Sequence, residues 1–379
     1  MKKKILFITA TRADFSKLKS LIQILQKNKK FDVKVFVTGM HLLNIYGNTV
    51  NEIHRSKIKN VICFKNQTEK NYLMVDSMSK TLKGLNNFIK KNLLNLIIIH
   101  GDRMEALAGA VAGAFNNIPV AHIEGGELSG TIDDSIRHSI SKLSHFHFVS
   151  NNDSKRRLIQ MGENKKSIFT IGSPDLDIMK KKNLPTFIRA QKFYNFNYRN
   201  FCIIIFHPVT TCNQENNKNL KIIQKLVVDN KNSNFLCILP NNDPGSHKFV
   251  KLYKKLSKFN NFKCYPSMRF EYFLTFLKKS RFIIGNSSSG VREAPFFGVN
   301  CINIGSRQNK RVLKSNLIHN LNNFNDIDLI FKKLMSQKKK SNKKEQNFGS
   351  GRSNQLIKKI FSKKDFWNIN IQKSFNDLD

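Results

Sequence analysis

The chain has 379 residues, of which 65 are lysine or arginine and 26 are aspartate or glutamate, so its formal net charge is +39 at pH 7. No apolar run reaches the roughly 18 residues that a membrane-spanning helix requires, and the apolar stretch after the basic N-terminus is too short for a signal peptide. We therefore expect a cytoplasmic protein without a membrane partner, and the length suits two domains rather than one.

The distribution of lysines and cysteines argues against further classes of protein. Lysines are spread over most of the predicted helices rather than gathered on one of them, so we do not expect nucleic acid as the partner. A basic background instead suits an anionic substrate, because it raises the local potential. The six cysteines are scattered without a CxxC pair, and most lie inside apolar runs, so we expect buried, reduced thiols and neither zinc nor disulfides.

In the first half of the chain, short apolar runs alternate with amphipathic stretches. The apolar runs predict strands at Ile5–Thr9, Val33–Thr38, Val61–Phe64, Leu96–His100, Val120–Glu124 and Phe146–Val149. The amphipathic stretches predict helices at Asp14–Lys27, Tyr72–Lys90, Met104–Asn116 and Asp134–Lys142. Continuous apolar strands that alternate with helices indicate a parallel sheet covered on both faces.

The same pattern restarts in the second half. Strands are predicted at Phe201–His207, Phe235–Pro240, Phe282–Gly285 and Cys301–Ile304, and helices at Leu220–Asp229, Ser246–Ser257, Phe270–Lys279 and Val291–Phe297. The turn-rich Gly172–Asp175 marks the boundary. We expect Rossmann-like domains over 1–175 and 176–379, with the last helices able to pack back on the first domain. The polar Ser336–Ser353 is predicted to be a surface loop.

The first candidate site follows the first predicted strand, where Thr9–Asp14 opens a helix. Two doubly wound domains place a ligand between the carboxyl ends of their sheets. Backbone amides at a helix N-terminus favour anions, and Arg12 can add a charge-assisted hydrogen bond to a phosphate. The alternative is that Asp14 only caps the helix, and the two roles are compatible.

Three carboxylates of the same half follow strands or begin a helix. Asp102 and Glu124 each come at the end of a predicted strand. Asp133 stands at the entry of a helix that carries Arg137. Helix capping would explain one aspartate, but buried carboxylates are costly unless they are paired or used. Carboxylates that converge on one cleft suit proton transfer at carbon, because neighbouring negative charges raise the pKa of one of them.

Two further candidates follow strands of the second half. His207 ends an apolar strand, a position that in such folds is typical of a site residue rather than a core residue. The loop Gly285–Gly290 joins a strand to a helix, and its amides and hydroxyls favour phosphate. Glu293, one turn later, can accept ribose hydroxyls; the alternative is that it faces solvent. The chain lacks a Walker ending, a GxGxxG motif and metal-ligand spacing, so we expect no cofactor and no metal.

Together these motifs resemble those of one protein family. In chain order they are Thr-Arg-Ala-Asp (11–14), Thr-Gly-Met-His-Leu (38–42), His-Gly-Asp-Arg (100–103), His-Ile-Glu-Gly-Gly-Glu (122–127), Gly-Thr-Ile-Asp-Asp-Ser-Ile-Arg-His (130–138), Gly-Ser-Pro-Asp (172–175), Phe-His-Pro-Val-Thr (206–210), Gly-Asn-Ser-Ser-Ser-Gly-Val-Arg-Glu (285–293) and Gly-Ser-Arg-Gln (305–308). The sequence resembles the hydrolysing UDP-N-acetylglucosamine 2-epimerases of sialic and nonulosonic acid biosynthesis. It lacks the Thr-Arg-Pro-Glu and His-Val-Glu-Ala-Gly-Leu-Arg motifs of the non-hydrolysing branch, and Ala10 stands where the family usually has glycine.

The resemblance implies a GT-B-like fold, with an interdomain cleft, and the conversion of UDP-N-acetylglucosamine and water to N-acetylmannosamine and UDP without a cofactor. In the family's scheme the C2 proton is removed and UDP leaves, which gives 2-acetamidoglucal. Water then adds at C1 and a proton returns to the opposite face of C2. The resemblance also implies a homodimer or homotetramer.

Position by position, the resemblance implies catalytic roles for Asp102, Glu124, Asp133 and His207. It implies substrate or nucleotide contacts for a larger set, in which either Asn241 or Asp243 touches the nucleotide. The set is Arg12, His41, Arg103, Arg137, Asn241, Asp243, Arg269, Ser287, Ser288, Glu293 and Arg307.

Two other functions stay open at the level of the sequence. Within the family, the substrate can instead be a UDP- or GDP-linked 2,4-diacetamido-2,4,6-trideoxyhexose on the route to legionaminic acid. From another class, a GT-B glycosyltransferase would need an acceptor. A protein that only binds nucleotide sugars or nucleic acid would leave the three carboxylates unexplained.

Overall fold

The computed structural model describes residues 2–69, 73–181, 183–311, 315–337 and 342–377. The chain forms two compact units. The first consists of Met1–Glu127, Asp133–Lys180 and Phe348–Asp379, and the second of Leu128–Ile132 and Lys181–Asn347. Within the described ranges, no helix is long and apolar enough to cross a membrane.

The first unit is built on a sheet of seven parallel strands in the order β3-β2-β1-β4-β5-β6-β7. The strands are β1 (Lys3–Thr9), β2 (Phe31–Val37), β3 (Val61–Cys63), β4 (Leu96–His100), β5 (Val120–Ile123), β6 (Phe146–Val149) and β7 (Ile168–Thr170). The residues of the central strands are apolar on both faces, so both faces must be covered by helices.

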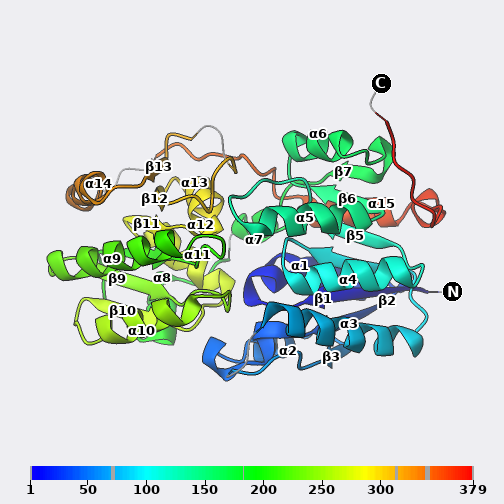
Figure 1. Cartoon of the computed structure of the whole chain (residues 1–379), viewed down its shortest axis with the longest axis horizontal. Helices are drawn as coiled ribbons and strands as arrows, with labels where there is room; N and C mark the ends of the chain where they lie inside the picture. Colours follow the sequence, from blue (N-terminus) through cyan, green and yellow to red (C-terminus); the bar gives the residue numbers. More distant parts are fainter. Residues whose placement is uncertain (1, 70–72, 182, 312–314, 338–341, 378–379) are drawn as a thin grey trace. The chain divides into compact units, whose positions relative to one another are not determined.

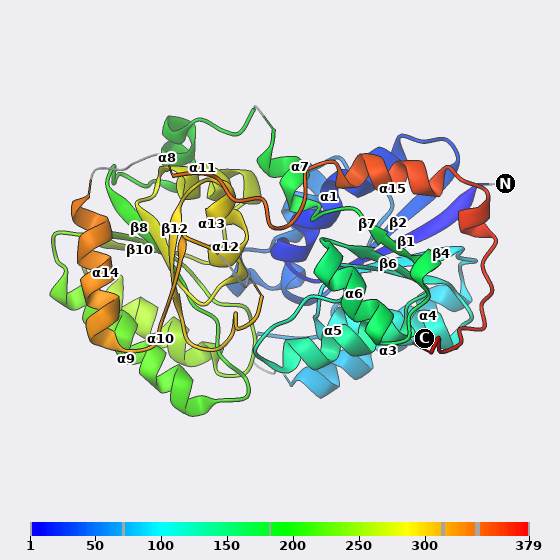
Figure 2. The same cartoon turned by 90° about the horizontal axis from the view of Figure 1, so that it is seen from above.

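Two layers of helices cover this sheet (Figure 1, Figure 2). The helices of the first unit are α1 (Arg12–Gln26), α2 (Val50–Arg55), α3 (Met74–Lys90), α4 (Met104–Phe115), α5 (Ile132–Leu143), α6 (Asn152–Gln160), α7 (Asp175–Met179) and α15 (Ser353–Phe361). Ile5 and Phe7 of β1 face the core under α1 and α15. Leu6 and Ile8 face the core under α3, α4 and α5. Alternation along one strand thus supplies both cores.

The last helix returns to the first unit although it comes from the end of the chain. Figure 2 shows α15 alongside α1, and the Asn354 side chain donates a hydrogen bond of 2.6 Å to the Ser20 hydroxyl. Ile357 and Phe361 of α15 are buried in the core under α1.

The second unit has a parallel sheet of six strands in the order β10-β9-β8-β11-β12-β13. Its strands are β8 (Phe201–Ile205), β9 (Asn234–Ile238), β10 (Phe262–Tyr265), β11 (Phe282–Gly285), β12 (Asn300–Ile304) and β13 (Ile318–Leu321). Its helices are α8 (Phe187–Tyr194), α9 (Asn213–Asp229), α10 (Ser246–Leu256), α11 (Phe270–Lys279), α12 (Ser288–Val291), α13 (Glu293–Phe296) and α14 (Phe324–Ser336).

The strands expected from the sequence are present, and the three that were not expected share one property. These are β7, β10 and β13. Each of them lies at an edge of its sheet, beside one neighbouring strand. They are three or four residues long and only partly buried, so their sequences lack the continuous apolar run of a central strand.

Two of the expected helices differ clearly from the observed ones. Helix α9 begins at Asn213 rather than Leu220, because the Asn216 side chain is buried and bonds the backbone N–H and carbonyl of Val209 at 2.7 and 2.9 Å. The helix expected over Val291–Phe297 is two short helices that meet at Arg292. The expected start at Tyr72 and the lysines at 338–340 lie outside the described residues.

Candidate active site

The carboxyl ends of the parallel strands bring the sequence-predicted residues of each unit to one edge of its sheet. In the first unit the order β2-β1-β4-β5 makes the loops after these strands neighbours. In the second unit β8 lies beside β11, and their ends carry His207 and Asn286. Ligands of doubly wound sheets bind at such edges.

Glu124, directly after β5, is the most constrained residue of the site. Its backbone has φ +65°, in the left-handed region that residues other than glycine rarely adopt, and it is 3% exposed. The Lys17 ammonium donates to both of its carboxylate oxygens at 2.9 and 3.1 Å. The His100 Nε2 atom lies 3.0 Å from Oε2, and the Ser173 hydroxyl donates to Oε1. A strained, buried carboxylate held from three sides is typical of a functional site.

Lys17 was not predicted as a site residue. It lies on α1, where its ammonium is also 3.4 Å from the Asp175 carboxylate, and it is only 9% exposed. The only signal in the sequence is its place on the apolar face of α1, four residues before Leu21. The sequence assigned Ser173 and Asp175 to a domain boundary, but the structure brings both to the Glu124 cluster.

Asp102 belongs to a second ion-pair group, centred on Arg137 of α5. Arg137 is 1% exposed and its guanidinium contacts the Asp102 carboxylate directly. It also donates to the Glu127 carbonyl at 3.0 Å and lies 3.7 Å from Asp134. Burial lowers the pKa of Arg137, but the charges of Asp102, Glu127, Asp133 and Asp134 outweigh burial and raise it. The negative charges of Asp102 and Asp133 therefore both interact with the buried guanidinium of Arg137.

The loop after β1 is organised by Asp14. Its carboxylate accepts the backbone N–H groups of Ala10 and Thr11 at 3.0 and 3.1 Å and the Thr9 hydroxyl, and Thr11 and Asp14 form a capping box at the start of α1. Burial raises the pKa of Asp14, while these hydrogen bonds lower it. The capping role expected for Asp14 is confirmed. Arg12 points to Glu52, with an N–O distance of 2.9 Å.

His41 and Arg103 are held beside this loop. His41 is fully buried between the hydroxyls of Thr9 and Thr49, at 3.0 Å from Nε2 and 2.6 Å from Nδ1. Burial, with the nearby Arg12 and Arg103, lowers the pKa of His41 to about 3, so its imidazole is neutral at physiological pH. Arg103, the residue before α4, donates to the Glu105 carboxylate at 3.1 Å.

In the second unit, Asn286 ties the two strand ends together. Its side chain accepts from the His207 N–H at 2.7 Å and donates to the His207 carbonyl at 2.8 Å. The His207 Nδ1 accepts the Asn241 N–H at 3.1 Å, so a neutral imidazole carries its proton on Nε2. The side chains of Arg307 and Gln308 donate to the Asn286 carbonyl at 3.4 and 2.9 Å. The structure thus brings His207, Asn241 and Arg307 together.

The loop after β11 begins a very short helix. Ser287 caps α12 by accepting the Ser289 N–H at 3.3 Å, and Ser288 is its first residue. Glu293 is 4% exposed, so the alternative of a solvent-facing side chain is wrong; the break in the helix at Arg292 turns it inward.

The last two predicted residues lie apart from this loop in the chain. Asp243 is in the turn before α10, where its carbonyl accepts the Ser246 N–H at 3.0 Å. Arg269 immediately precedes α11, and its guanidinium stacks over the rings of Phe193 and Tyr272 at 5.9 and 5.6 Å. Arg269 therefore has a clear packing role within the second unit.

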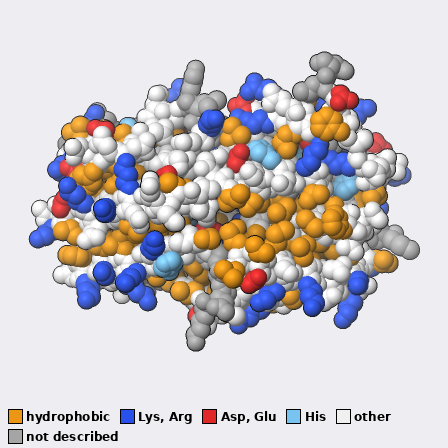
Figure 3. Space-filling view, viewed as in Figure 1, with side chains coloured by type: hydrophobic (Ala, Val, Ile, Leu, Met, Phe, Trp, Pro, Cys, Tyr) orange, Lys and Arg blue, Asp and Glu red, His pale blue; other side chains and the backbone are white. Residues whose placement is uncertain are grey.

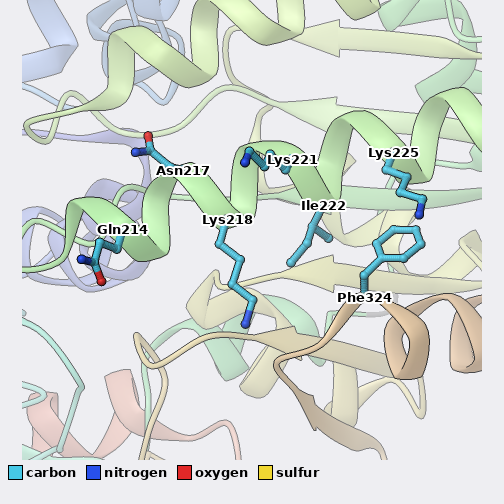
Figure 4. Close-up of a pocket in the computed structure, with 7 residues that line it drawn as sticks. All are labelled: Gln214, Asn217, Lys218, Lys221, Ile222, Lys225 and Phe324. Carbon is cyan, nitrogen blue, oxygen red and sulfur yellow. The ribbon is translucent and has the colours of Figure 1, made fainter.

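A pocket of about 480 Å³ lies elsewhere on the second unit, along the outer side of α9 (Figure 4). Lys218, Lys221 and Lys225 line it, and the Lys225 ammonium lies 4.3 Å from the centre of the Phe324 ring. None of the sequence-predicted residues lines this pocket. Among the described residues, no group of three or more His, Cys, Asp or Glu side chains is arranged to hold a metal ion.

Comparison with known proteins places the chain in a family. A sequence model of a protein family, described as UDP-N-acetylglucosamine 2-epimerase, matches residues 23–362. The chain belongs to the UDP-N-acetylglucosamine 2-epimerase family. It is 40% identical to a UDP-N-acetylglucosamine 2-epimerase of Neisseria meningitidis, over 99% of both chains. It is 34% identical to a UDP-N,N'-diacetylbacillosamine 2-epimerase (hydrolyzing) of Legionella pneumophila, over 89% of this chain and 88% of that one.

Solved structures of the UDP-N-acetylglucosamine 2-epimerase family share the fold. The crystal structure of a UDP-GlcNAc 2-epimerase from Neisseria meningitidis bound to UDP-GlcNAc matches with a TM-score of 0.79, at 20% identity, over 95% of this chain and 99% of that one. The expected GT-B-like class, with two Rossmann-type parallel sheets, is confirmed.

Proposed function

We propose that the chain is a hydrolysing 2-epimerase that converts UDP-N-acetylglucosamine and water to N-acetylmannosamine and UDP. Its family and the 40% identity to a full-length relative named UDP-N-acetylglucosamine 2-epimerase support this proposal. The observation that carries it is Glu124, a buried carboxylate in a left-handed conformation that is held by Lys17, His100 and Ser173. A buried carboxylate in a strained conformation does not improve the packing of the core, so stability does not explain Glu124. Removal of the C2 proton, in contrast, requires a base that is held in position.

The proposed reaction needs acid/base groups on two faces of the sugar. Removal of the C2 proton and departure of UDP from C1 give 2-acetamidoglucal. Water then adds at C1, and a proton is delivered to the opposite face of C2. Glu124 and Asp102 are held in different ion pairs, with Lys17 and Arg137, which supports different roles for them. We assign Asp133 to the same catalytic group because it shares Arg137 with Asp102.

The nucleotide contacts in the proposal come from the second unit. His207, whose Nδ1 accepts the Asn241 N–H so that a neutral ring carries its proton on Nε2, assists the departure of the diphosphate. Ser287, Ser288, Glu293 and Arg307 bind the nucleotide, as does either Asn241 or Asp243. Arg12 and Arg103 of the first unit contact the sugar or its phosphates, and the fully buried His41 positions the loop after β1 through its bond with Thr9.

The test is a reaction in heavy water, followed by NMR. With UDP-N-acetylglucosamine, we expect free UDP and N-acetylmannosamine that carries one deuterium at C2, because a carboxylic acid in a wet cleft exchanges its proton with solvent. Asp102→Asn, Glu124→Gln and Asp133→Asn should each lower kcat by at least about 10²-fold. Asp153→Asn, an exposed aspartate of α6, is the control. A product without deuterium at C2 contradicts the elimination mechanism.

A second candidate differs only in the sugar. The 34% identity to each of two relatives, named UDP-N,N'-diacetylbacillosamine 2-epimerase (hydrolyzing) and GDP/UDP-N,N'-diacetylbacillosamine 2-epimerase (hydrolyzing), favours a UDP- or GDP-linked 2,4-diacetamido-2,4,6-trideoxyhexose. Parallel incubations with these nucleotide sugars decide between the two. Release of UDP or GDP from a diacetamido sugar, with none from UDP-N-acetylglucosamine, would replace the first candidate. Sugar transfer that depends on an added acceptor would instead indicate a glycosyltransferase.

A further inference from the structure

Another pocket lies in the first unit, where β1 and β2 begin. Its volume is about 560 Å³, and its lining comes from three segments that are far apart in the sequence, within 2–3, 29–31 and 361–367. Figure 2 shows the start of β1 beside the end of α15. None of the residues proposed for the reaction lines this pocket.

Lysines dominate the lining of this pocket. Six of its ten lining residues are lysine and none is acidic, whereas lysine and arginine together make up 65 of the 379 residues of the chain. Figure 3 shows lysine and arginine side chains scattered over the face that it views, with other side chains between them. The pocket is therefore more than a sample of the basic background. We call its six lysines the lysine cluster: Lys2, Lys3, Lys29, Lys30, Lys363 and Lys364.

Helix ends account for only a small part of this charge. Helix α1 ends at Gln26 and α15 at Phe361, and the C-terminus of a helix attracts cations with about half an elementary charge. Two such ends offset about one of the six positive charges. Among the described residues, no ammonium group of the lysine cluster has an ion-pair or hydrogen-bond partner. Like charges that converge without a counter-charge raise the local potential, so the pocket attracts anions.

Aromatic side chains form the apolar wall of the pocket. Phe31 and Phe361 are buried in the core, and the Trp367 ring packs against both, with ring centres 5.9 and 5.6 Å apart. The indole N–H of Trp367 donates to the Phe361 carbonyl at 2.8 Å, which fixes the ring. The Lys3 ammonium lies 5.4 Å from the centre of the Trp367 ring. One lysine of the cluster is thus in direct contact with the aromatic wall.

We propose that this pocket binds a small molecule that carries two or more phosphate groups. Its volume is in the range of about 300–1,000 Å³ that is typical of small-molecule sites, and lysine binds phosphate as a point charge. One phosphate group carries a charge of about −1.5 to −2 at pH 7, so a single group would leave most of the lysine cluster without a counter-charge. A membrane or a nucleic-acid duplex presents its phosphates on an extended surface, which would reach the rim of the pocket but not its aromatic wall.

The pocket is separate from the candidate active site. It lies at the first residue of β1, whereas the loop that Asp14 organises follows the last residue of this strand. Strand β1 has seven residues, which span about 20 Å at about 3.3 Å per residue. A ligand in the pocket is therefore additional to the substrate, and the proposal does not depend on the reaction that the enzyme catalyses.

Trp367 makes binding in the pocket measurable, because it is the only tryptophan of the chain. Inorganic tripolyphosphate is the probe, since it carries phosphate groups and no ring. We expect a saturable change in Trp367 fluorescence at physiological salt, because the ligand draws Lys3 away from the indole ring, and a matching heat in titration calorimetry. Inorganic monophosphate should bind at least about tenfold more weakly. Neither fluorescence change nor heat at millimolar tripolyphosphate overturns the proposal.

Two pairs of substitutions that remove the same charge separate the pocket from the basic background. Lys30→Gln with Lys363→Gln takes two exposed lysines from two of the lining segments and should weaken tripolyphosphate binding at least about tenfold. The matched control is Lys165→Gln with Lys166→Gln, two exposed lysines of the first unit outside the pocket, which should leave the affinity unchanged. Equal losses in both pairs, or binding that neither pair weakens, would place the anion elsewhere and overturn the proposal.

Further ligands identify the source of the phosphate groups, judged by the binding that the Lys30→Gln and Lys363→Gln pair removes. ATP that binds more tightly than tripolyphosphate would identify a nucleotide whose base contacts the aromatic wall. Equal affinity would identify a compound that is recognised by its phosphates alone. Binding of phosphatidylglycerol vesicles or of a DNA duplex, with none of tripolyphosphate, would overturn the proposal, because the lysine cluster would then serve an extended surface.

Discussion

At the scale of single residues, Glu124 shows how much structure is needed to hold one carboxylate. A left-handed conformation of a residue other than glycine costs on the order of 1–3 kcal/mol and persists only when its surroundings enforce it. Here Gly125 follows, and a Cβ atom at this glycine would lie 2.7 Å from the Ser141 hydroxyl and 2.8 Å from the His122 ring. The chain directly after Glu124 therefore leaves no room for a side chain at position 125.

Replacing Lys17 tests whether this cluster positions Glu124. Lys17→Met leaves the buried Glu124 and Asp175 without their cation, so we expect kcat to fall by about 10–10²-fold and stability to fall by about 3–5 kcal/mol. KM should change little, because Lys17 contacts carboxylates of its own unit. Lys17→Arg, which keeps the charge, should restore part of kcat. Lys27→Met, at the exposed end of α1, is the control; an equal loss of kcat there would refute the role of Lys17.

At the scale of helices and strands, the sequence predicts those features that depend on one continuous segment of the chain. Central strands have continuous apolar runs, so β4, β5, β8 and β11 and the polar residues at their ends were expected where they lie. Edge strands such as β13, with the sequence Ile-His-Asn-Leu, are too polar to show such a run. The contacts of Lys17 with Glu124, and of Ser173 with Glu124, join residues 107 and 49 positions apart. No local pattern predicts such contacts, because only the order of strands in the sheet creates them.

The pairing of β8 with β11 offers a test at this scale. Gly285 has φ +143°, and a Cβ atom there would lie 1.9 Å from the Ile205 carbonyl oxygen of β8. Gly285→Ala should push the strands apart, with a loss of about 1–3 kcal/mol. UDP affinity should also fall, because Asn286 and His207 follow these strands.

The control variant Gly245→Ala distinguishes the effect of this steric clash from the effect of a positive φ angle. Gly245 also has a positive φ, +93°, but a Cβ atom there meets nothing closer than 3.5 Å. If urea denaturation finds the two variants equally destabilised, the close approach of β8 and β11 is not the reason for glycine at position 285.

At the scale of the whole molecule, buried histidines link stability to pH. Burial lowers the pKa of both His41 and His122 to about 3, from an ordinary value of 6.5. Between these values the unfolded chain binds a proton at each histidine and the folded chain does not. The free energy of unfolding should therefore fall as the pH falls from 6.5 towards 3, by about 1.4 kcal/mol per pH unit for each histidine. Burial also lowers the pKa of His147, so this histidine adds to the fall in the free energy of unfolding at low pH.

One variant isolates a single histidine from this pH dependence. The His122 ring lies between the Gly101 carbonyl, at 2.7 Å, and the Ser141 hydroxyl, at 2.9 Å, and a glutamine amide can replace both bonds. His122→Gln should reduce the slope between pH 4.5 and 6.5 by about 1.4 kcal/mol per pH unit. The chain has one tryptophan, Trp367, which packs on Phe31 in the first unit, so its fluorescence in urea reports the unfolding of the unit that contains His122. His54→Gln, at an exposed position, should leave the slope unchanged. An unchanged slope in His122→Gln would mean that the folded state already holds the proton on His122.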